Sequence, residues 1–308
     1  MSDNFVDAGA VAGFVSSYYP PFEGLPSVQV MLRRVEDPSS AFSGTTDSGG
    51  QFSIPNVPSG MYELLAEAIG YASVVDTVEV QLGALTELDL RMDGLPQVTS
   101  HQVRTEHISR WFPADDLFRL VIETTVDDPD GLGDIERVLF SVPDFNFSDT
   151  LAVTSGDPSR FTRTFDESQL PTTLQDLLGR TLQIEVRDRL GHAGFAPDAQ
   201  IVRIIDPTPL AESPTFPDPV GPQPGLVWRS LDLPFMFTYR VNVVFVPSAG
   251  QQTLVGSYGN LSPSDTTFTV PDPLSLGDYS WTVAVEDVFG NRSRSKEAGF
   301  RVVSGAGP

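Results

Sequence analysis

Apolar and polar residues alternate in short runs along most of the chain. Near the N-terminus the alternation runs through residues 11–15, 28–32 and 52–54. A period of two over four to seven residues is typical of a β-strand with one face in a core. Turn sequences such as TDSGG at residues 46–50 separate the runs, because Asp47 can bond to its own backbone and glycine accepts a positive φ. The pattern predicts antiparallel strands joined by hairpins and corners.

The same pattern continues toward the C-terminus. Further strand-like runs stand at residues 118–124, 138–142, 182–186, 226–228, 237–243, 266–270, 276–285 and 300–302. One stretch instead has helical signals, namely leucines at i, i+3 and i+4, a capping box and a stop glycine: Leu174, Leu177 and Leu178, Thr172 with Gln175, and Gly179. We therefore expect one short helix within a β-rich segment.

The length of the chain, 308 residues, is too great for one ordinary β-sandwich and suits three of roughly 100 residues each. Seven prolines in residues 206–225 are typical of an extended, semi-rigid connector, whose front part can pair as an edge strand. The predicted fold class is all-β, with three tandem antiparallel β-sandwiches and one short helix in the second. The predicted boundaries are an N-terminal tail at 1–8, sandwiches at 9–95, 96–205 and 226–308, and a proline-rich linker at 206–225.

Three stretches of the first predicted sandwich resemble a known family. They are GLPSVQV at residues 24–30, TDSGGQFSIPNVPSGMY at residues 46–62, and Gly70-Tyr71. In this order they resemble the carboxypeptidase regulatory-like domain over nearly the whole segment. The resemblance implies a prealbumin-like sandwich of seven strands, an accessory unit of exported proteins that binds carbohydrate or spaces other domains. It implies no catalytic residue.

The second and third sandwiches have looser resemblances. VDDPDGLGDI at residues 126–135, followed by VRDRLGH at residues 186–192, is similar to bacterial immunoglobulin-like domains. The strand series beyond the linker resembles a fibronectin type III module through four residues: Trp228, Tyr239, Leu276 and Tyr279. In such a module the first would be the early core tryptophan and the second would lie on the central strand. The last two have the spacing of a tyrosine corner, whose hydroxyl would bond to nearby backbone. This resemblance implies adhesion, spacing or binding.

The charge of the chain is strongly negative, at -22 from 41 acidic and 19 basic residues. A surface this negative repels phosphate backbones and anionic lipid headgroups, so we expect no nucleic acid partner. Lys296 is the only lysine, which fits either a GC-rich genome or adaptation to high salt. The chain has no cysteine, which excludes disulfides, thiolate nucleophiles and cysteine-bound metals.

The acidic stretch after the strand at residues 118–126 is the best candidate for ligand binding. Asp127, Asp128, Asp130 and Asp134 stand in a loop with two glycines, and Ca²⁺ prefers six to eight oxygen ligands of this kind. The spacing lacks the ninth-position ligand and the terminal glutamate of an EF-hand. DPDG also forms an ordinary turn whose acids bond to their own backbone. A calcium site and a solvated turn both stay open, and no other cofactor is expected.

Two further acidic turns are explained without a ligand. Asp188 with Gly191, and Asp287 with Gly290 and Asn291, stand at matching places in the second and third sandwiches, just after a strand. Asp can bond forward across a turn, and Asn tolerates a left-handed backbone. These residues predict β-hairpins.

The histidines and one aromatic group are the remaining candidates. His101 and His107 would share a strand face but lie about 20 Å apart, so they cannot bind one ion together. Tyr18, Tyr19 and Phe22 stand in a predicted loop, where the rings either stack on a sugar or fold onto the core. The metalloprotease, P-loop and dinucleotide-binding motifs are absent from the sequence. We expect no enzymatic activity.

These observations predict a non-catalytic, exported or cell-surface protein that acts as a spacer, adhesion or interaction scaffold. The alternatives are a carbohydrate-binding accessory protein of a polysaccharide-degrading system and a subunit of an extracellular filament, and the partner, protein or carbohydrate, stays open. No apolar run approaches the roughly 20 residues that span a bilayer, and residues 1–4 lack the features of a signal peptide. A processed leader, or the lipidated cysteine of a bacterial lipoprotein, in place of Met1 would place the chain at the outer membrane or in the periplasm.

Overall fold

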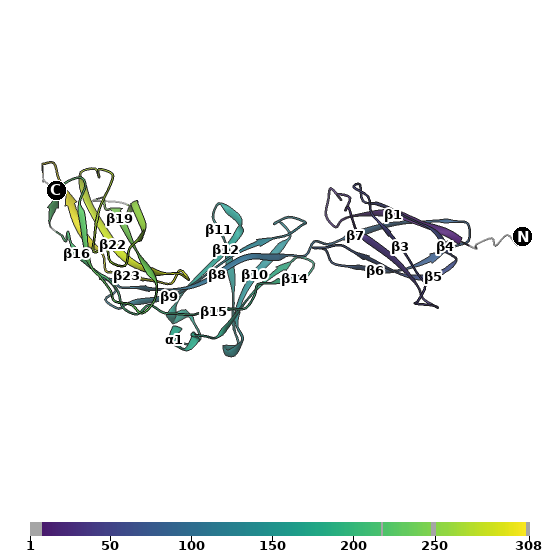
Figure 1. The fold of residues 1–308 in the computed structure, drawn as a ribbon, viewed down its shortest axis with the longest axis horizontal. Coiled ribbons are helices and arrows are strands. Elements are labelled where there is room, and N and C mark those ends of the chain that lie inside the picture. The colour runs from purple at the N-terminus through teal and green to yellow at the C-terminus, as the bar shows by residue number, and fades with distance from the viewer. Residues whose placement is uncertain (1–7, 217, 248–250, 306–308) are drawn as a thin grey trace, which may run out of the picture.

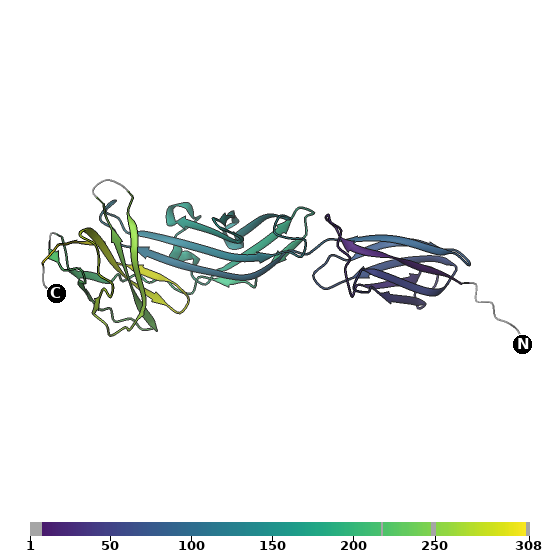
Figure 2. The ribbon, with the colours of Figure 1, turned by 90° about the horizontal axis from the view of Figure 1, so that it is seen from above.

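The computed structural model describes residues 8–216, 218–247 and 251–305. Strands form nearly all of the regular structure, and they build three β-sandwiches that follow one another along a long axis (Figure 1). The view from above has the same order, with a thin connection between the first sandwich and the second (Figure 2). The predicted all-β fold of three tandem sandwiches is confirmed. The predicted tail, residues 1–8, lies outside the described residues apart from Ala8.

The first sandwich has seven strands in two sheets. They are β1 (Ala8–Ser17), β2 (Gln29–Arg34), β3 (Ala41–Thr45), β4 (Gln51–Pro58), β5 (Gly60–Glu67), β6 (Val74–Val80) and β7 (Leu85–Met92). One sheet has the order β4-β1-β7, with β1 parallel to β7, and the other has the order β3-β2-β5-β6. In β5, Tyr62, Leu64 and Ala66 are buried and alternate with more exposed neighbours. The period of two in the sequence therefore marks the face that enters the core.

The second sandwich is built from one long path of strands that curls on itself. Its strands are β8 (Gln97–Ile108), β9 (Leu117–Asp127), β10 (Ile135–Val142), β11 (Phe147–Thr154), β12 (Asp157–Asp166), β13 (Thr181–Asp188), β14 (Ala193–Phe195) and β15 (Ala199–Gln200). They pair in the order β14-β13-β10-β11-β12-β9-β8, and β15 also pairs with β13. Ile122, Phe140, Phe165 and Val186, from four different strands, lie in one hydrophobic core.

A four-residue helix, α1 (Leu174–Leu177), lies between β12 and β13. Leu174 and Leu177 are buried, which confirms the predicted short helix and its apolar face. The predicted N-cap, Thr172, is wrong by one residue. Thr173 has the extended backbone of a cap, and its hydroxyl accepts a hydrogen bond from the Asp176 amide. Among the described residues, no helix has the length and apolarity needed to cross a membrane.

The third sandwich includes most of the proline-rich segment. Its strands are β16 (Leu210–Ser213), β17 (Pro219–Val220), β18 (Gly225–Arg229), β19 (Phe237–Phe245), β20 (Thr253–Leu261), β21 (Thr267–Thr269), β22 (Gly277–Asp287), β23 (Arg292–Arg294) and β24 (Ala298–Val302). One sheet has the order β16-β18-β21, and the other has the order β23-β22-β19-β20, with β24 on β22. Within residues 206–225, β16 pairs with β18 and β17 pairs with β24. The segment expected to connect two domains thus adds strands to the third one, beginning with the edge strand expected at its front.

The core of the third sandwich has the expected aromatic residues. Trp228 and Tyr239 are buried, and their rings meet edge to face. The Tyr279 hydroxyl donates to the Ser275 carbonyl at 2.9 Å, which is the bond of a tyrosine corner. Leu276, predicted with Tyr279 from the spacing of this corner, has a side chain that is 62% exposed.

The strand β8 joins the second sandwich to the third. Near its C-terminal end it pairs in parallel with β23, and Glu106 lies opposite Arg292. The Thr105 amide also donates to Asn291 Oδ1 at 2.9 Å. The two sandwiches therefore share a continuous hydrogen-bonded sheet, and their relative position is held by backbone as well as side-chain bonds.

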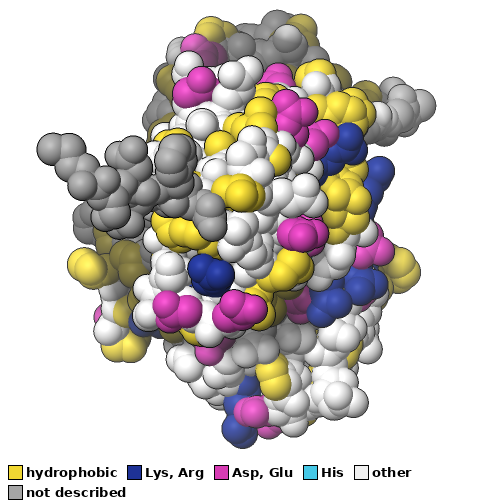
Figure 3. Space-filling model, turned by 90° about the vertical axis from the view of Figure 1, so that its right-hand side faces the viewer, with side chains coloured by type: hydrophobic (Ala, Val, Ile, Leu, Met, Phe, Trp, Pro, Cys, Tyr) yellow, Lys and Arg dark blue, Asp and Glu magenta, His cyan; other side chains and the backbone are white. Residues whose placement is uncertain are grey.

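The junction between the first and second sandwiches is thinner. Residues 93–96 connect β7 to β8, and within the described residues no named strand of the first sandwich pairs with one of the second. Side-chain and loop contacts therefore decide how firmly the first sandwich is held. At the N-terminal end of the molecule, formed by the first sandwich, hydrophobic, acidic and basic side chains are interspersed over the surface (Figure 3).

Candidate metal centre

Acidic side chains gather where the first sandwich meets the second. One of them follows β7, three stand in the loop between β9 and β10, one ends β13, and a histidine stands in the turn before β14. We call this set the junction cluster; its members are Asp93, Asp128, Asp130, Asp134, Asp188 and His192. Because they come from three segments of the chain, only the folded arrangement of two domains brings them together.

The loop between β9 and β10 folds through two consecutive turns that orient its acids. Asp128 Oδ1 accepts a hydrogen bond from the Asp130 amide at 2.8 Å, and the Asp128 carbonyl accepts one from the Gly131 amide at 2.9 Å. Gly131 has a φ of +95°, which glycine adopts without strain. The Asp134 amide then donates to the Gly131 carbonyl at 2.9 Å. These turns leave the Asp128 and Asp134 side chains buried at the junction.

Asp188 closes the turn from β13 to β14 with only one of its two oxygens. Its Oδ1 accepts hydrogen bonds from the Gly191 amide at 2.6 Å and the His192 amide at 2.8 Å. The pairing of β13 with β14 confirms the predicted hairpin. Its Oδ2 has no hydrogen-bond partner and lies 3.4 Å from His192 Nδ1. The turn therefore accounts for one oxygen of Asp188 and leaves the other unexplained.

Two polar contacts cross the junction within the cluster. Asp93 Oδ2 lies 2.7 Å from His192 Nδ1, and the Gly94 amide donates to Asp130 Oδ2 at 2.6 Å. A Cβ atom at Gly94 would lie 3.0 Å from Asp128 Oδ1, which is tighter than ordinary packing. Glycine at this position thus allows the linker to approach the acidic loop.

Five carboxylate oxygens of the cluster are buried without a hydrogen-bond partner among the described residues. They are Asp93 Oδ1, Asp128 Oδ2, both oxygens of Asp134, and Asp188 Oδ2. Asp188 is 0% exposed, and the other three residues are at most 5% exposed. Buried carboxylates are strongly destabilising unless they are hydrogen-bonded or paired with positive charge. A cation between these oxygens would satisfy them.

Three acids of the cluster lie close enough together to hold a single ion. One ligand atom from each of Asp128, Asp134 and Asp188 lies within 4.8 Å of the others. Asp93 forms one such group with Asp188 and His192, and another with Asp130 and Asp134. Oxygens around one Ca²⁺ ion lie about 2.3–2.6 Å from it, and therefore at most about 5 Å from one another. Among the described residues, His192 is the only basic side chain that pairs with these acids.

Burial and crowding shift the titration of the cluster. Burial raises the pKa of Asp128 to about 7, and the neighbouring aspartates add to the shift. Burial also raises the pKa of Asp93 to about 6, although the hydrogen bond with His192 lowers it. Tyr19, from the first sandwich, has a raised pKa chiefly because its hydroxyl faces the Asp134 carboxylate. Without a cation, the cluster favours protonated carboxyl groups over the full negative charge.

Three of the four predicted calcium ligands belong to the cluster. Asp128, Asp130 and Asp134 lie at the junction, whereas Asp127 does not. Asp127 is the last residue of β9, opposite Gln97, and its side chain is exposed. The exposed Asp127 thus ends the strand, whereas Asp128 is buried at the start of the loop.

Asp93, Asp188 and His192 complete the cluster and lie outside the predicted set. The turn sequence DRLGH at residues 188–192 carried a usable signal, because its aspartate needs only one oxygen for the turn. The sequence around Asp93 has no such signal, because the place of Asp93 in the cluster depends on how the first sandwich packs against the second.

The other predicted groups lie elsewhere. His107 is buried against Asp116, with 3.1 Å between His107 Nε2 and Asp116 Oδ2, and it stacks on Phe118. Tyr18 and Phe22 are 41% and 37% exposed, and the Arg91 guanidinium lies 4.3 Å from the Phe22 ring centroid. The Tyr19 hydroxyl faces the junction cluster. Of the three aromatic residues predicted for sugar stacking, only Tyr18 and Phe22 are therefore exposed.

The first sandwich matches a known domain family. Residues 10–93 match the model of the carboxypeptidase regulatory-like domain. The resemblance expected from the three sequence stretches is confirmed, and the matched segment ends at Asp93, the one acid that this domain supplies to the cluster. No curated protein matches the chain significantly.

Solved structures resemble the chain weakly. The major pilin subunit BcpA of Bacillus cereus matches at 9% identity over 96% of each chain, with a TM-score of 0.33. A putative carbohydrate binding protein from Bacteroides uniformis matches at 11% identity over 63% of this chain and 98% of its own, with a TM-score of 0.27. Fibronectin(III)-like modules of CbhA from Clostridium thermocellum match at 12% identity over 68% of this chain and 93% of their own, with a TM-score of 0.30. Likeness at this level concerns the β-sandwich architecture and carries no argument about function.

Proposed function

We propose that the chain is a non-catalytic scaffold of the cell exterior, which holds a binding partner or a neighbouring domain at a distance from the surface that carries it. The observation that supports this role is the arrangement of the three sandwiches end to end (Figures 1 and 2). A row of folded domains gives length and stiffness, which a spacer needs and an enzyme does not.

The junction of the second and third sandwiches supports the same role. The parallel pairing of β8 with β23 continues one sheet into the next domain. Arg203 adds an ion pair, with Nη1 2.7 Å from Asp287 Oδ2, and Gln102 Nε2 donates to the Phe289 carbonyl at 3.1 Å. Backbone pairing and buried charge together resist bending at this point.

Small-angle X-ray scattering on the full chain tests the scaffold. A single compact domain of this length would have a radius of gyration of about 19 Å. We expect a value well above this, with a pair-distance distribution skewed toward long distances. A value near that of a compact sphere would contradict the proposed spacer. Antibody labelling of intact cells that produce the protein tests its location, and labelling only after lysis would contradict an exterior scaffold.

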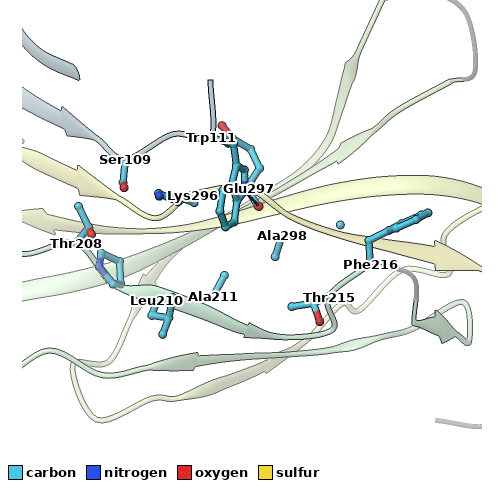
Figure 4. A pocket seen from close by; sticks show the side chains of 12 residues that line it. Ser109, Trp111, Thr208, Leu210, Ala211, Thr215, Phe216, Lys296, Glu297 and Ala298 are labelled. Atoms are coloured by element: carbon cyan, nitrogen blue, oxygen red, sulfur yellow. Dashed lines mark hydrogen bonds between the residues drawn. The ribbon is translucent and has the colours of Figure 1, made fainter. Parts of the chain in front are cut away.

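A carbohydrate-binding role is the second candidate, and one pocket favours it. The pocket has a volume of about 600 Å³ and lies between the loop after β8 and the third sandwich (Figure 4). Trp111 lines it and is 65% exposed, its Nε1 donates to the Glu297 carbonyl at 2.7 Å, and Lys296 Nζ lies 4.6 Å from its ring centroid. Phe216 lies at the other end of the pocket (Figure 4). Exposed rings beside polar groups suit the stacking and hydrogen bonding of a sugar.

A glycan array with the wild-type chain and a Trp111→Ala variant separates the two candidates. A pure spacer retains no glycan. Selective binding that the variant loses would support the carbohydrate role of this pocket. Binding that survives in the variant would move the sugar site elsewhere, with the exposed rings of Tyr18 and Phe22 as the next place to test.

A further inference from the structure

We infer that the junction cluster binds one Ca²⁺ ion, held by Asp128, Asp134 and Asp188 of the second sandwich and by Asp93 of the first. The ion would be shared between two domains, so its binding would fix the first sandwich against the second. Ion binding does not depend on the scaffold role, and it can be measured on the full chain whatever the chain holds or spaces.

The unpartnered oxygens are the first argument. Asp128 and Asp188 each present one buried oxygen without a hydrogen-bond donor, and the Asp134 carboxylate, which the Tyr19 hydroxyl faces, lies beside them. The other oxygens of Asp128 and Asp188 are used by backbone amides, which fix the two side chains in place. The free oxygens are therefore preorganised and turned toward the shared space, as ion ligands must be.

The second argument comes from the equivalent turn at the other junction. Asp287 ends β22 as Asp188 ends β13, and its Oδ1 likewise accepts two backbone amides, from Phe289 at 2.9 Å and Asn291 at 3.0 Å. Its Oδ2 is also satisfied, by Arg203 Nη1 at 2.7 Å and by Asn291 Nδ2 at 3.0 Å.

The two junctions thus use the same acidic turn with different partners. At the junction of the second and third sandwiches, a guanidinium provides the positive charge. At the junction of the first and second sandwiches, no arginine or lysine of the described residues pairs with the acids, and more acids converge. An ion from solution would supply at this junction the positive charge that Arg203 supplies at the other.

The donor set selects calcium among the common ions. Hard carboxylate oxygens, three of them within 4.8 Å of one another, suit Ca²⁺, which accepts many oxygens in flexible geometry. Mg²⁺ requires near-ideal octahedral geometry and retains several waters, and Zn²⁺ prefers nitrogen and sulfur. His192 Nδ1 is engaged by Asp93 at 2.7 Å, so the histidine positions a ligand and leaves the ion to oxygens.

Isothermal titration of the full chain, stripped of metal with a chelator, tests the inference. We expect one Ca²⁺ ion per chain with a dissociation constant between about 1 μM and 1 mM, and weaker binding of Mg²⁺. Asp188→Asn and Asp93→Asn should each weaken binding at least tenfold. In Asp188→Asn the side-chain amide still offers an oxygen to the turn amides, and circular dichroism of each variant checks that it folds.

Asp127→Asn is the matched control. It lies beside Asp128 in the sequence, removes the same charge, and faces away from the cluster. Its dissociation constant should equal that of the wild type. The inference is overturned if the wild type binds no Ca²⁺ at 10 mM, if Mg²⁺ binds equally well, or if Asp127→Asn weakens binding as much as Asp188→Asn.

Scattering with and without Ca²⁺ then tests the bridging role. We expect Ca²⁺ to narrow the long-distance part of the pair-distance distribution in the wild type and to leave this distribution unchanged in Asp93→Asn. Binding without any change in scattering would overturn the bridge. An elongated chain that does not bind Ca²⁺ would contradict the ion site but agree with the scaffold role. A compact chain that binds Ca²⁺ would support the ion site and contradict the scaffold role.

Discussion

Replacing Arg203 with methionine is expected to destabilise the third sandwich and its junction by about 2–4 kcal/mol. Asp287 is fully buried in the pair, and without the guanidinium its Oδ2 loses its counter-charge and retains only the Asn291 amide. The Arg203 guanidinium also lies 3.8 Å from the ring centroid of Phe235, so a cation–π contact is lost as well. Arg203 is 26% exposed, which places the loss below that of a wholly buried pair.

Guanidinium chloride unfolding followed by tryptophan fluorescence measures this loss. Trp228 and Trp281 both lie in the core of the third sandwich, so their emission follows the domain that the substitution affects. Because the chain has three domains, the third transition must be fitted separately from the others. The expected loss is independent of Ca²⁺, since the inferred ion site lies at the other junction.

Arg229→Met is the matched control for Arg203→Met. Arg229 Nη2 lies 2.8 Å from Glu212 Oε1 in the same domain, but the two side chains are 69% and 37% exposed. An exposed pair contributes about 0–1 kcal/mol, so this variant should unfold almost as the wild type does. Equal losses in the two variants would show that the buried Asp287 does not need the guanidinium.

The strands could be predicted because burial follows a local rule. In β5, the alternation of Tyr62, Leu64 and Ala66 with polar neighbours needs no knowledge of the partner sheet. The helix was predictable for the same reason, since its leucine spacing places one face inward whatever lies beneath it. Its cap was less certain, because Thr172 and Thr173 are adjacent and both hydroxyls bond to Asp176.

The junction cluster could be predicted only in part, because domain docking is not a local property. The loop between β9 and β10 showed its acids in the sequence, but alternation in β9 decides that Asp127 faces outward. Asp93 and His192 are 99 residues apart and meet only across two domains. The proline-rich segment illustrates the same limit, since prolines predict extended backbone but not which strand lies beside it.

Both junctions of the proposed scaffold contain the same kind of acidic turn, which Arg203 pairs with at one junction and the inferred ion would pair with at the other. A covalently attached guanidinium gives an angle that is always set, whereas an ion from solution gives an angle that depends on its concentration. Strand β8 runs from one junction to the other, from Gln97 beside the linker to Ile108 beside β23. The chain therefore combines one permanently fixed joint with one joint that an ion controls, if the inferred site binds as expected.

Replacing Trp281 with alanine is expected to lower the stability of the third sandwich by about 3–5 kcal/mol. Trp281 is fully buried in β22, so the substitution opens a large cavity in the core. Its Nε1 also donates to the Pro214 carbonyl at 3.0 Å, a bond that ties the proline-rich segment to the sandwich. Trp281→Phe fills most of the volume but leaves that carbonyl unpaired, and should cost about 1–3 kcal/mol.

Trp111→Ala separates the effect of burial from the effect of residue type. Trp111 also donates its Nε1 to a backbone carbonyl, that of Glu297 at 2.7 Å, but its side chain is 65% exposed. Its removal should therefore cost about 1 kcal/mol or less. The stability of Trp111→Ala is compared with that of the wild type by unfolding monitored through the fluorescence of the remaining Trp228 and Trp281. The stabilities of all the variants are compared by unfolding monitored through near-ultraviolet circular dichroism. If Trp111→Ala were as unstable as Trp281→Ala, the pocket beside the second sandwich, and not the core of the third, would hold this end of the chain together.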